Sequence, residues 1–333
     1  MTDPRLGFEA LNAALKAAGE DTRLRVLALL AEAELTVSDL TDILRQSQPR
    51  ISRHLKLLAE AGLVERFREG TWAFFRLAER GGGAAVARAL LDRLDPRDQT
   101  IERDRARLAS VRQARAAAAQ AYFRAHAAEW DRIRKLHVAD DAVEAAIRSA
   151  LADKPFRSLL DLGTGTGRML EMFGADIERG LGIDLSLDML LLARDRLERG
   201  GLRNCSVRQG DIYDLPLAND SFDVVILHQV LHFLDDGARA IQEAARVLRP
   251  GGRLLVVDFA PHEEEFLREQ FAHRRLGFAP ETVTQWITAS GLEPAMHKSL
   301  APEPGSGVTI AVSLWLARDV RALMAVTASR EVA

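Results

Sequence analysis

The sequence predicts an α/β protein of two domains: a small helical domain ending in a β-hairpin, and a larger domain in which strands and helices alternate. The chain has 333 residues, which at about 100–200 residues per domain is enough for two. Short helices with apolar stripes fill its beginning, and alternating strands and helices follow residue 157. Hydrophobic residues make up 47% and charged residues 28%, a composition that excludes disordered and collagen-like chains.

The composition also limits the kinds of site and location that we expect. The one cysteine, Cys205, excludes an intrachain disulfide and any site built from several cysteines. No apolar run of about 18 residues occurs, so we expect no transmembrane helix and no membrane partner. The first residues lack the apolar core of a signal peptide, which predicts a cytoplasmic protein.

Three short helices are predicted in the first domain. The first begins at a cap near Asp21, and the second has Thr36 as a candidate N-cap with Asp39 three residues later. After a polar break, Pro49 opens a third helix, which ends at Gly62. Two short helices joined by a turn of about four residues form a helix-turn-helix.

The third helix and the hairpin after it predict a surface for a polyanion. From Arg45 to Arg76 there are seven basic residues against three acidic ones, a charge excess that by itself fits either a polyanion partner or a solvated surface. Two β-rich runs flank Glu69-Gly70-Thr71, and a basic hairpin of this kind can lie along a phosphate backbone. The outward face of the third helix should carry donors suited to base edges and phosphates: Gln48, Arg50, Ser52, Arg53, His54 and Lys56.

The segment from Ser47 to Val64, with the hairpin from Arg68 to Trp72, resembles the recognition helix and wing of the ArsR/SmtB family of winged-helix repressors. The resemblance covers about residues 8–80. It implies a winged helix-turn-helix over residues 1–80, regulation of transcription, double-stranded DNA as a partner and a homodimer. The DNA-binding residues would be the six of the helix together with Arg68.

One departure from the family concerns metal sensing. Arsenic-responsive members carry two cysteines in the helix before the turn, and Thr36 and Ser38 stand in those places here. The thiolates that a soft metal requires are absent, so we expect no metal site.

A helical linker or dimerisation segment is predicted over residues 81–120. Gly81-Gly82-Gly83 should form a flexible break before it. Leu94, Ile101 and Leu108 recur every seven residues, which fits either a dimer helix or a solvated connector. Three aromatic residues then either cover a ligand pocket or belong to the next core: Tyr122, Phe123 and Trp130.

The second domain, predicted over residues 121–318 with a tail at 319–333, has the pattern of a βαβ series. Such a series forms a mostly parallel sheet with helices on both faces, and its ligands bind at the carboxyl ends of the strands. Five strands are expected: 158–162, 180–184, 205–209, 222–227 and 253–259.

A glycine loop, Asp161-Leu162-Gly163-Thr164-Gly165-Thr166-Gly167-Arg168, follows the first of these strands. Its third glycine comes one residue too early for a dinucleotide fingerprint, and a P-loop lysine is absent. An acid beside close backbone instead suits a ligand with a cationic amino-acid end. Asp184 ends the second strand, where ribose hydroxyls are usually held, and Asp211 ends the third.

These elements, with Arg249-Pro250-Gly251-Gly252 after them, resemble the class I S-adenosylmethionine-dependent methyltransferases over about residues 120–318. The resemblance implies a Rossmann-like, mostly parallel seven-stranded sheet, a last antiparallel strand at Val308–Leu316, and S-adenosyl-L-methionine or S-adenosyl-L-homocysteine as cofactor. The residues that it assigns to the cofactor are Asp161, Gly163, Thr164, Gly165, Gly167, Asp184, Leu185, Met189, Asp211, Ile212 and His228.

The catalytic residues are not determined by these patterns. His228 and His232 follow the fourth strand, and His273 lies in a charged segment that could close a substrate pocket. The alternative is that all three are pocket or surface residues without a proton role. The chain resembles the bacterial proteins that fuse the two domains, which implies a DNA-binding regulator. Two alternatives stay open: a small-molecule methyltransferase whose winged helix serves dimerisation or autoregulation, and a non-catalytic sensor of the cofactor.

Overall fold

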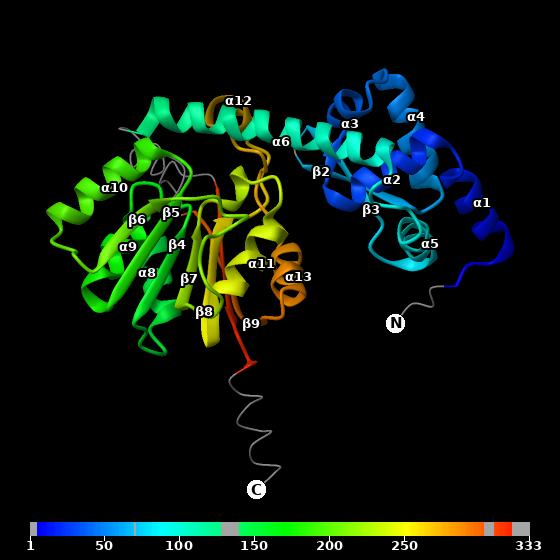
Figure 1. Cartoon of the computed structure of the whole chain (residues 1–333). Helices are drawn as coiled ribbons and strands as arrows, with labels where there is room; N and C mark the ends of the chain where they lie inside the picture. The colour runs from blue at the N-terminus through cyan, green and yellow to red at the C-terminus, as the bar shows by residue number, and fades with distance from the viewer. Residues whose placement is uncertain (1–4, 70, 128–139, 303–309, 322–333) are drawn as a thin grey trace, which may run out of the picture. The chain divides into compact units, whose positions relative to one another are not determined.

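The computed structural model describes residues 5–69, 71–127, 140–302 and 310–321. The chain divides into two compact units, Met1–Ala117 and Ala118–Ala333, and the division falls within one long helix, α6 (Gln99–His126) (Figure 1). Among the helices of these described ranges, none is long and apolar enough to cross a membrane. Each unit has its own hydrophobic core.

The first unit is helical, with a three-stranded antiparallel sheet in the order β1-β3-β2. The predicted helices and hairpin are present, and α1 and the two-residue β1 are additions to the prediction. In chain order its elements are α1 (Phe8–Ala18), α2 (Asp21–Glu32), β1 (Leu35–Thr36), α3 (Val37–Leu44), α4 (Gln48–Glu60), β2 (Val64–Glu69), β3 (Trp72–Leu77), α5 (Gly81–Leu91) and the first part of α6.

The helix starts show which of the predicted caps the chain uses. The Thr36 hydroxyl accepts from the Asp39 amide at 3.2 Å and the Asp39 carboxylate accepts from the Thr36 amide at 2.9 Å, a capping box that confirms Thr36. The cap of α2 lies one residue earlier than predicted. It is Glu20, whose longer side chain reaches the Arg23 amide at 2.9 Å.

The three glycines after the hairpin do not form the predicted flexible break, because they are the first turn of α5. A Cβ on Gly83 would lie 2.2 Å from the carbonyl oxygen of Gly62, just past the end of α4. The helix therefore packs directly against backbone, which only glycine permits at this position.

The predicted seven-residue repeat does not form a seam for a second chain. Leu108 belongs to the core of the first unit, Ile101 is buried, and Leu94 lies before α6 begins. Between them the buried Asp104 accepts two hydrogen bonds from the Arg25 guanidinium, at 2.6 and 2.7 Å. These contacts dock the first part of α6 onto its own unit, so Ile101 and Leu108 serve its core.

The second unit contains the predicted seven-stranded, mostly parallel sheet, in the order β6-β5-β4-β7-β8-β10-β9. β10 runs antiparallel to its neighbours β8 and β9, and the other neighbouring strands of the sheet are parallel. After α6 the described elements are α8 (Asp140–Leu151), β4 (Ser158–Leu162), α9 (Arg168–Phe173), the 3-10 helix η2 (Gly174–Asp176), β5 (Arg179–Asp184), α10 (Leu187–Arg199), β6 (Cys205–Gln209), β7 (Phe222–His228), the 3-10 helix η3 (Leu231–Phe233), α11 (Gly237–Val247), β8 (Leu248–Phe259), α12 (Phe266–Phe271), α13 (Pro280–Ala289), β9 (Glu293–Leu300) and β10 (Val312–Arg318).

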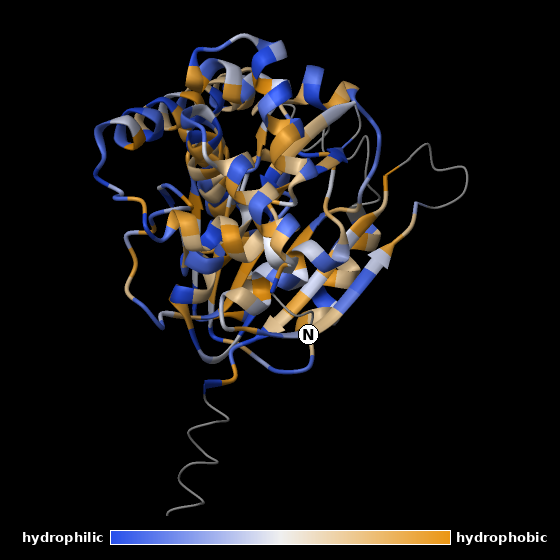
Figure 2. Cartoon of the chain, turned by 90° about the vertical axis from the view of Figure 1, so that its right-hand side faces the viewer, coloured by the Kyte–Doolittle hydropathy of each residue, from blue (hydrophilic) through white to orange (hydrophobic). Residues whose placement is uncertain are grey.

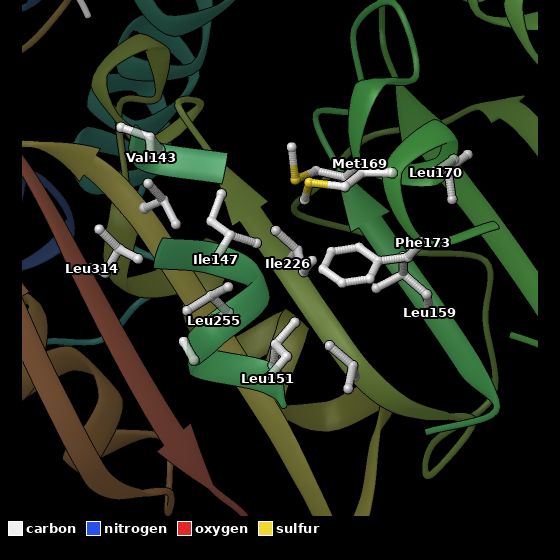
Figure 3. Close-up of a cluster of buried hydrophobic side chains, with 14 of the residues drawn as sticks. Val143, Ile147, Leu151, Leu159, Met169, Leu170, Phe173, Ile226, Leu255 and Leu314 are labelled. Carbon is white, nitrogen blue, oxygen red and sulfur yellow. The ribbon is translucent and has the colours of Figure 1, made fainter. Parts of the chain in front are cut away.

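Neighbouring residues of each central strand face opposite layers of this unit. Leu159 of β4 packs in one core with Ile147 of α8 and Phe173 of α9 (Figure 3). The next residue, Leu160, packs in the other core with Ile241 of α11. Both faces are therefore covered by helices, and functional side chains must come from the ends of the strands.

The last strands differ in detail from the prediction. The final strand is β10, with bounds Val312–Arg318, and Val308 of the predicted range lies outside the described residues. β9, which the sequence did not predict, is hydrophilic and mostly exposed beside the buried β10 (Figure 2). Polar side chains and Pro294 on this edge strand disfavour pairing with another sheet.

Candidate functional site

The helix α4 presents the polar face predicted for DNA contact. Its long stripe of buried apolar residues holds it on the core of the first unit, which leaves the opposite side free. Pro49 stands in its first turn, as predicted. Five of the six predicted donors are exposed on this helix: Gln48, Arg50, Ser52, Arg53 and Lys56.

His54 is the exception, and its predicted place on the outward face is wrong. It is 8% exposed, because it lies three residues after Ile51 and one before Leu55, on the buried side of the helix. Its Nδ1 lies 3.6 Å from the Glu20 carboxylate. Burial, above all, lowers the pKa of His54, with nearby arginines adding to the effect and Glu20 opposing it.

The hairpin of β2 and β3 carries both aromatic and basic side chains. Phe67 and Phe74 stack across the strands with ring centroids 5.6 Å apart, while Arg66 and Arg68 are exposed. Trp72 is 40% exposed at the start of β3. Arg76, counted among the basic residues of this region, forms ion pairs with glutamates, one of them with Glu79 at 2.8 Å, so it adds little to the basic surface.

In the second unit, the glycine loop leaves β4 and turns immediately toward β5. The amides of Gly163 and Thr164 both donate to the Ile183 carbonyl, at 2.8 and 3.0 Å. Gly163, Gly165 and Gly167 all have positive φ, between 52° and 81°. Asp161 does not face outward from this loop. It is 2% exposed, and it accepts a 2.6 Å hydrogen bond from the Thr164 hydroxyl.

Asp184 joins the loop to the end of β5. One carboxylate oxygen accepts from the Gly165 amide at 2.8 Å and the other from the Ser186 amide at 2.8 Å. Burial raises the pKa of the Asp184 carboxyl, and these two amides act in the opposite direction. The Leu185 amide acts in the same direction, and a carboxylate with about four lone-pair positions keeps the capacity to accept a ligand hydroxyl.

The other predicted cofactor residues lie around the same strand ends. Leu185 is 38% exposed directly after β5, and Met189 is buried at the start of α10. Asp211 is exposed after β6, where it accepts a 2.9 Å hydrogen bond from the Tyr213 amide, and Ile212 beside it is buried. His228 is the last residue of β7 and is half-buried. The donor set fits an adenosyl ligand, with Asp184 for ribose hydroxyls and apolar side chains for the base.

A cluster of three histidines around one aspartate lies beyond the ends of β7 and β8. We call His232, His262, His273 and Asp258 the histidine cluster. The His232 Nδ1 lies 2.8 Å from the Asp258 carboxylate, and the His232 and His273 rings are 4.2 Å apart. Burial is the main reason that the pKa of His262 is lowered to about 4, and a positive charge on His232 lowers this pKa further. Of the predicted catalytic candidates, the structure brings together His232 and His273.

Sequence reasoning missed Asp258 and gave His262 no role. A signal for Asp258 exists, because it is an acid within an otherwise apolar run at the end of β8 and is 0% exposed. A charge in such a place normally has a partner. That partner, His232, is 26 positions earlier in the chain, so only the sheet brings the two together.

Tyr122 and Phe123, at the end of α6, pack on aromatic residues of the second unit. The ring centroids of Phe123 and Phe233 are 4.8 Å apart, and those of Tyr122 and Phe271 are 6.3 Å apart. Burial raises the pKa of Tyr122 to about 12. These contacts place Phe123 next to η3 and Tyr122 next to α12, which fits a pocket cover as well as a core. Trp130 lies outside the described residues.

Two family models match the chain. Residues 20–66 match the model described as bacterial regulatory protein, arsR family, and residues 160–256 match the one described as methyltransferase domain. The first match includes α4, and the second runs from β4 to β8. The predicted fusion of these two domains is confirmed.

Several curated proteins are similar to part of the chain. The uncharacterized methyltransferase YcgJ of Bacillus subtilis is 32% identical over 115 residues, 34% of this chain and 46% of that protein. Its crystal structure superposes with a TM-score of 0.45 at 19% identity, covering 53% of this chain and 97% of that one. The ubiquinone/menaquinone biosynthesis C-methyltransferase UbiE of Vibrio vulnificus is 36% identical over 111 residues, 32% of this chain and 43% of that protein. The arsenite methyltransferase of Halobacterium salinarum is 35% identical over 109 residues, which are 31% of this chain and 27% of that protein. The chain thus spans less than half the length of each of these relatives.

Proposed function

We propose that this fusion of an ArsR-family helix-turn-helix domain with a methyltransferase domain is a transcriptional regulator that binds double-stranded DNA and S-adenosyl-L-methionine or S-adenosyl-L-homocysteine. One observation carries the proposal: the chain combines an exposed basic face on α4 with a carboxylate, Asp184, held at the joined ends of β4 and β5. A protein with this DNA partner works in the cytoplasm of a bacterium.

The DNA contact follows from the chemistry of the exposed side chains. On α4, Arg50 and Arg53 can donate to guanine in the major groove, and Gln48 can pair with adenine. The exposed Arg66 and Arg68 of the hairpin reach phosphates, which carry no sequence information. In this proposal α4 reads the DNA sequence, and the hairpin holds the duplex through its phosphates.

We further propose a homodimer that pairs through α1. Phe8, Leu11 and Leu15 are 86%, 39% and 48% exposed, and their spacing of three and four residues places them on one helical face. Two copies would bury this apolar stripe and present two α4 helices to successive major grooves. Leu11→Glu should convert the dimer to a monomer in sedimentation experiments, whereas Lys16→Glu on the same helix should not.

Selection of bound duplexes from a random DNA pool tests the first half of the proposal. The expected result is an inverted repeat whose half-sites lie about one helical turn apart, because a symmetric dimer reads a symmetric site. If no sequence is enriched, the proposed function as a transcriptional regulator is contradicted. Calorimetry tests the second half: S-adenosyl-L-methionine and S-adenosyl-L-homocysteine should bind, and NAD should not.

The two other functions make different predictions. A pure sensor would bind cofactor without turnover, and its DNA affinity would differ between the free, S-adenosyl-L-methionine and S-adenosyl-L-homocysteine states at fixed salt. A small-molecule methyltransferase would turn over with DNA affinity unchanged. The His232–Asp258 pair favours turnover, because binding alone requires no buried proton acceptor. The names of two relatives, a ubiquinone/menaquinone biosynthesis C-methyltransferase and an arsenite methyltransferase, indicate unlike acceptors, so the acceptor has to be inferred from the residues of this chain.

A further inference from the structure

We propose that His232 is the general base of the methyl-acceptor pocket, that Asp258 is its positioning residue, and that the acceptor is a flat aromatic compound with an acidic hydroxyl group. The inference rests on the proposed methyltransferase function and adds a substrate class to it. It follows from three features of the second unit: the hydrogen bonding of the pair, its place beside the glycine loop, and the aromatic walls around it.

The hydrogen bonds of Asp258 determine the state of the His232 ring. Asp258 is 0% exposed, and besides the ring it accepts from the amide of Phe259 at 2.8 Å. A carboxylate can only accept here, so the His232 Nδ1 at 2.8 Å carries the proton. In the neutral ring Nε2 then carries the lone pair, which is the form that a general base requires.

The position of η3 brings this base to the cofactor side of the sheet. A Cβ on Gly163 would lie 2.4 Å from a methyl group of Val230, so the glycine loop presses against the residue two before His232. From the other side, the His232 carbonyl accepts the amides of Arg274 and Arg275, at 2.8 and 3.0 Å. The backbone of His232 is thus fixed between the predicted cofactor loop and the segment after α12.

The surroundings of His232 suit a flat ring more than a charged ligand. Its ring centroid lies 4.1 Å from that of Phe233 and 4.7 Å from that of Phe259. The Phe259 and His273 rings are nearly parallel, 20° apart at 5.5 Å. Stacking on such walls is worth about 0.5–1.5 kcal/mol per aromatic pair.

The charged groups near the pair are themselves matched. Arg274 forms an ion pair with Asp235 at 2.7 Å, and Arg268 forms one with Glu265 at 3.2 Å. The third histidine of the cluster, His262, is neutral at physiological pH because burial lowers its pKa to about 4. His273, the other histidine of the cluster, lies beside His232. Among the described residues, these pairings leave the surroundings of His232 suited to a neutral acceptor.

The group-transfer step balances with these residues alone and the cofactor as methyl donor. The hydroxyl proton of the acceptor passes to Nε2 of His232, and the oxygen forms a bond to the methyl carbon. The electron pair of the broken carbon–sulfur bond remains on sulfur. The products are the methyl ether, S-adenosyl-L-homocysteine and a protonated His232 beside the Asp258 carboxylate, which solvent then deprotonates.

The probe for this proposal is 4-nitrophenol, whose anion is yellow. It is titrated into the full chain in the presence of S-adenosyl-L-homocysteine, below the pH at which the free phenol ionises. We expect saturable yellow absorbance with the natural chain and its loss in His232→Gln, which keeps a donor toward Asp258 but has no basic nitrogen. In Asp258→Asn the absorbance should fall while the probe still binds. Binding without ionisation in the natural chain, or no binding, would overturn the proposal.

Methyl transfer to the same phenol gives a second readout. A general base contributes about 10²–10⁴-fold, so His232→Gln should lower kcat by that factor with little change in KM. The matched control is His297→Gln, an exposed histidine on β9, which should leave both unchanged. Equal kcat in His232→Gln and the natural chain contradicts the inference. Calorimetry with S-adenosyl-L-homocysteine distinguishes a failure of the proposed function from a failure of this inference. If the natural chain does not bind S-adenosyl-L-homocysteine, the proposed methyltransferase function is wrong, whereas binding without an effect of His232→Gln contradicts only the role of His232.

Discussion

The helix α4 and the histidine cluster place their polar side chains in opposite environments. On α4 the polar side chains are exposed, so that they can exchange water for a partner. In the histidine cluster Asp258 is fully buried and His232 is 2% exposed, so that hydrogen bonds fix a proton position before any ligand arrives. The comparison teaches that a surface which reads a large partner needs accessible donors, whereas a base needs a preorganised, dry environment.

The largest effect is expected at Asp184, which combines burial with the capacity to bind. Asp184→Ala should weaken S-adenosyl-L-methionine and S-adenosyl-L-homocysteine together by about 1.5–3 kcal/mol, because charge-assisted hydrogen bonds to a diol are lost. Calorimetry measures both affinities. The control is Asp195→Ala, an exposed aspartate of α10. Unchanged affinity in Asp184→Ala would mean that this carboxylate serves only to hold the loop.

A slightly smaller effect is expected for the exposed arginines of α4. Arg53→Ala or Arg50→Ala should cost about 1–3 kcal/mol on the selected sequence and far less on unrelated DNA, if each side chain reads a base. Gel-shift titrations on both duplexes measure the difference. Arg97→Ala, an exposed arginine before α6, serves as control. An equal loss on all sequences would assign these arginines to phosphates instead.

A uniform effect is expected for the hairpin. Arg68→Ala should weaken all duplexes alike and lower the slope of log affinity against log salt by about 0.9, since one phosphate contact is lost. Anisotropy titrations over a salt series give the slope. If the slope is unchanged while the affinity falls, the residue acts through packing and not through a phosphate.

The last predicted effect is a pH dependence of stability. Burial holds the pKa of His54 and of His262 below 6.5, and for His262 the value is about 4. The unfolded chain therefore binds these protons more readily than the folded one, so the free energy of unfolding should fall as the pH drops from about 6.5 toward 4. His262→Gln should flatten this slope in thermal unfolding, and His297→Gln should not. A slope unaltered by His262→Gln would place the titration elsewhere.

The sequence predicted the exposed face of α4 more accurately than the buried histidine cluster. The exposed donors of α4 follow from helical periodicity, and only His54 was misplaced. A polar residue type suggested a surface position, although the spacing of His54 to Ile51 and Leu55 is that of a core residue. The βα order and the acid at the end of β5 were likewise readable, since strand ends are marked by local patterns. The pairing of His232 with Asp258 was not, because no local pattern records which loops a parallel sheet brings together.

The contact between Gly83 and Gly62 has a consequence for mutagenesis of this chain. By helix propensity alone, alanine in place of a helical glycine gains about 1 kcal/mol, so a propensity scale would rank Gly83→Ala as an improvement. The added methyl group would meet a carbonyl oxygen at 2.2 Å and push α5 away from the end of α4. A library randomised over α5 and screened for growth at raised temperature should therefore return glycine at position 83.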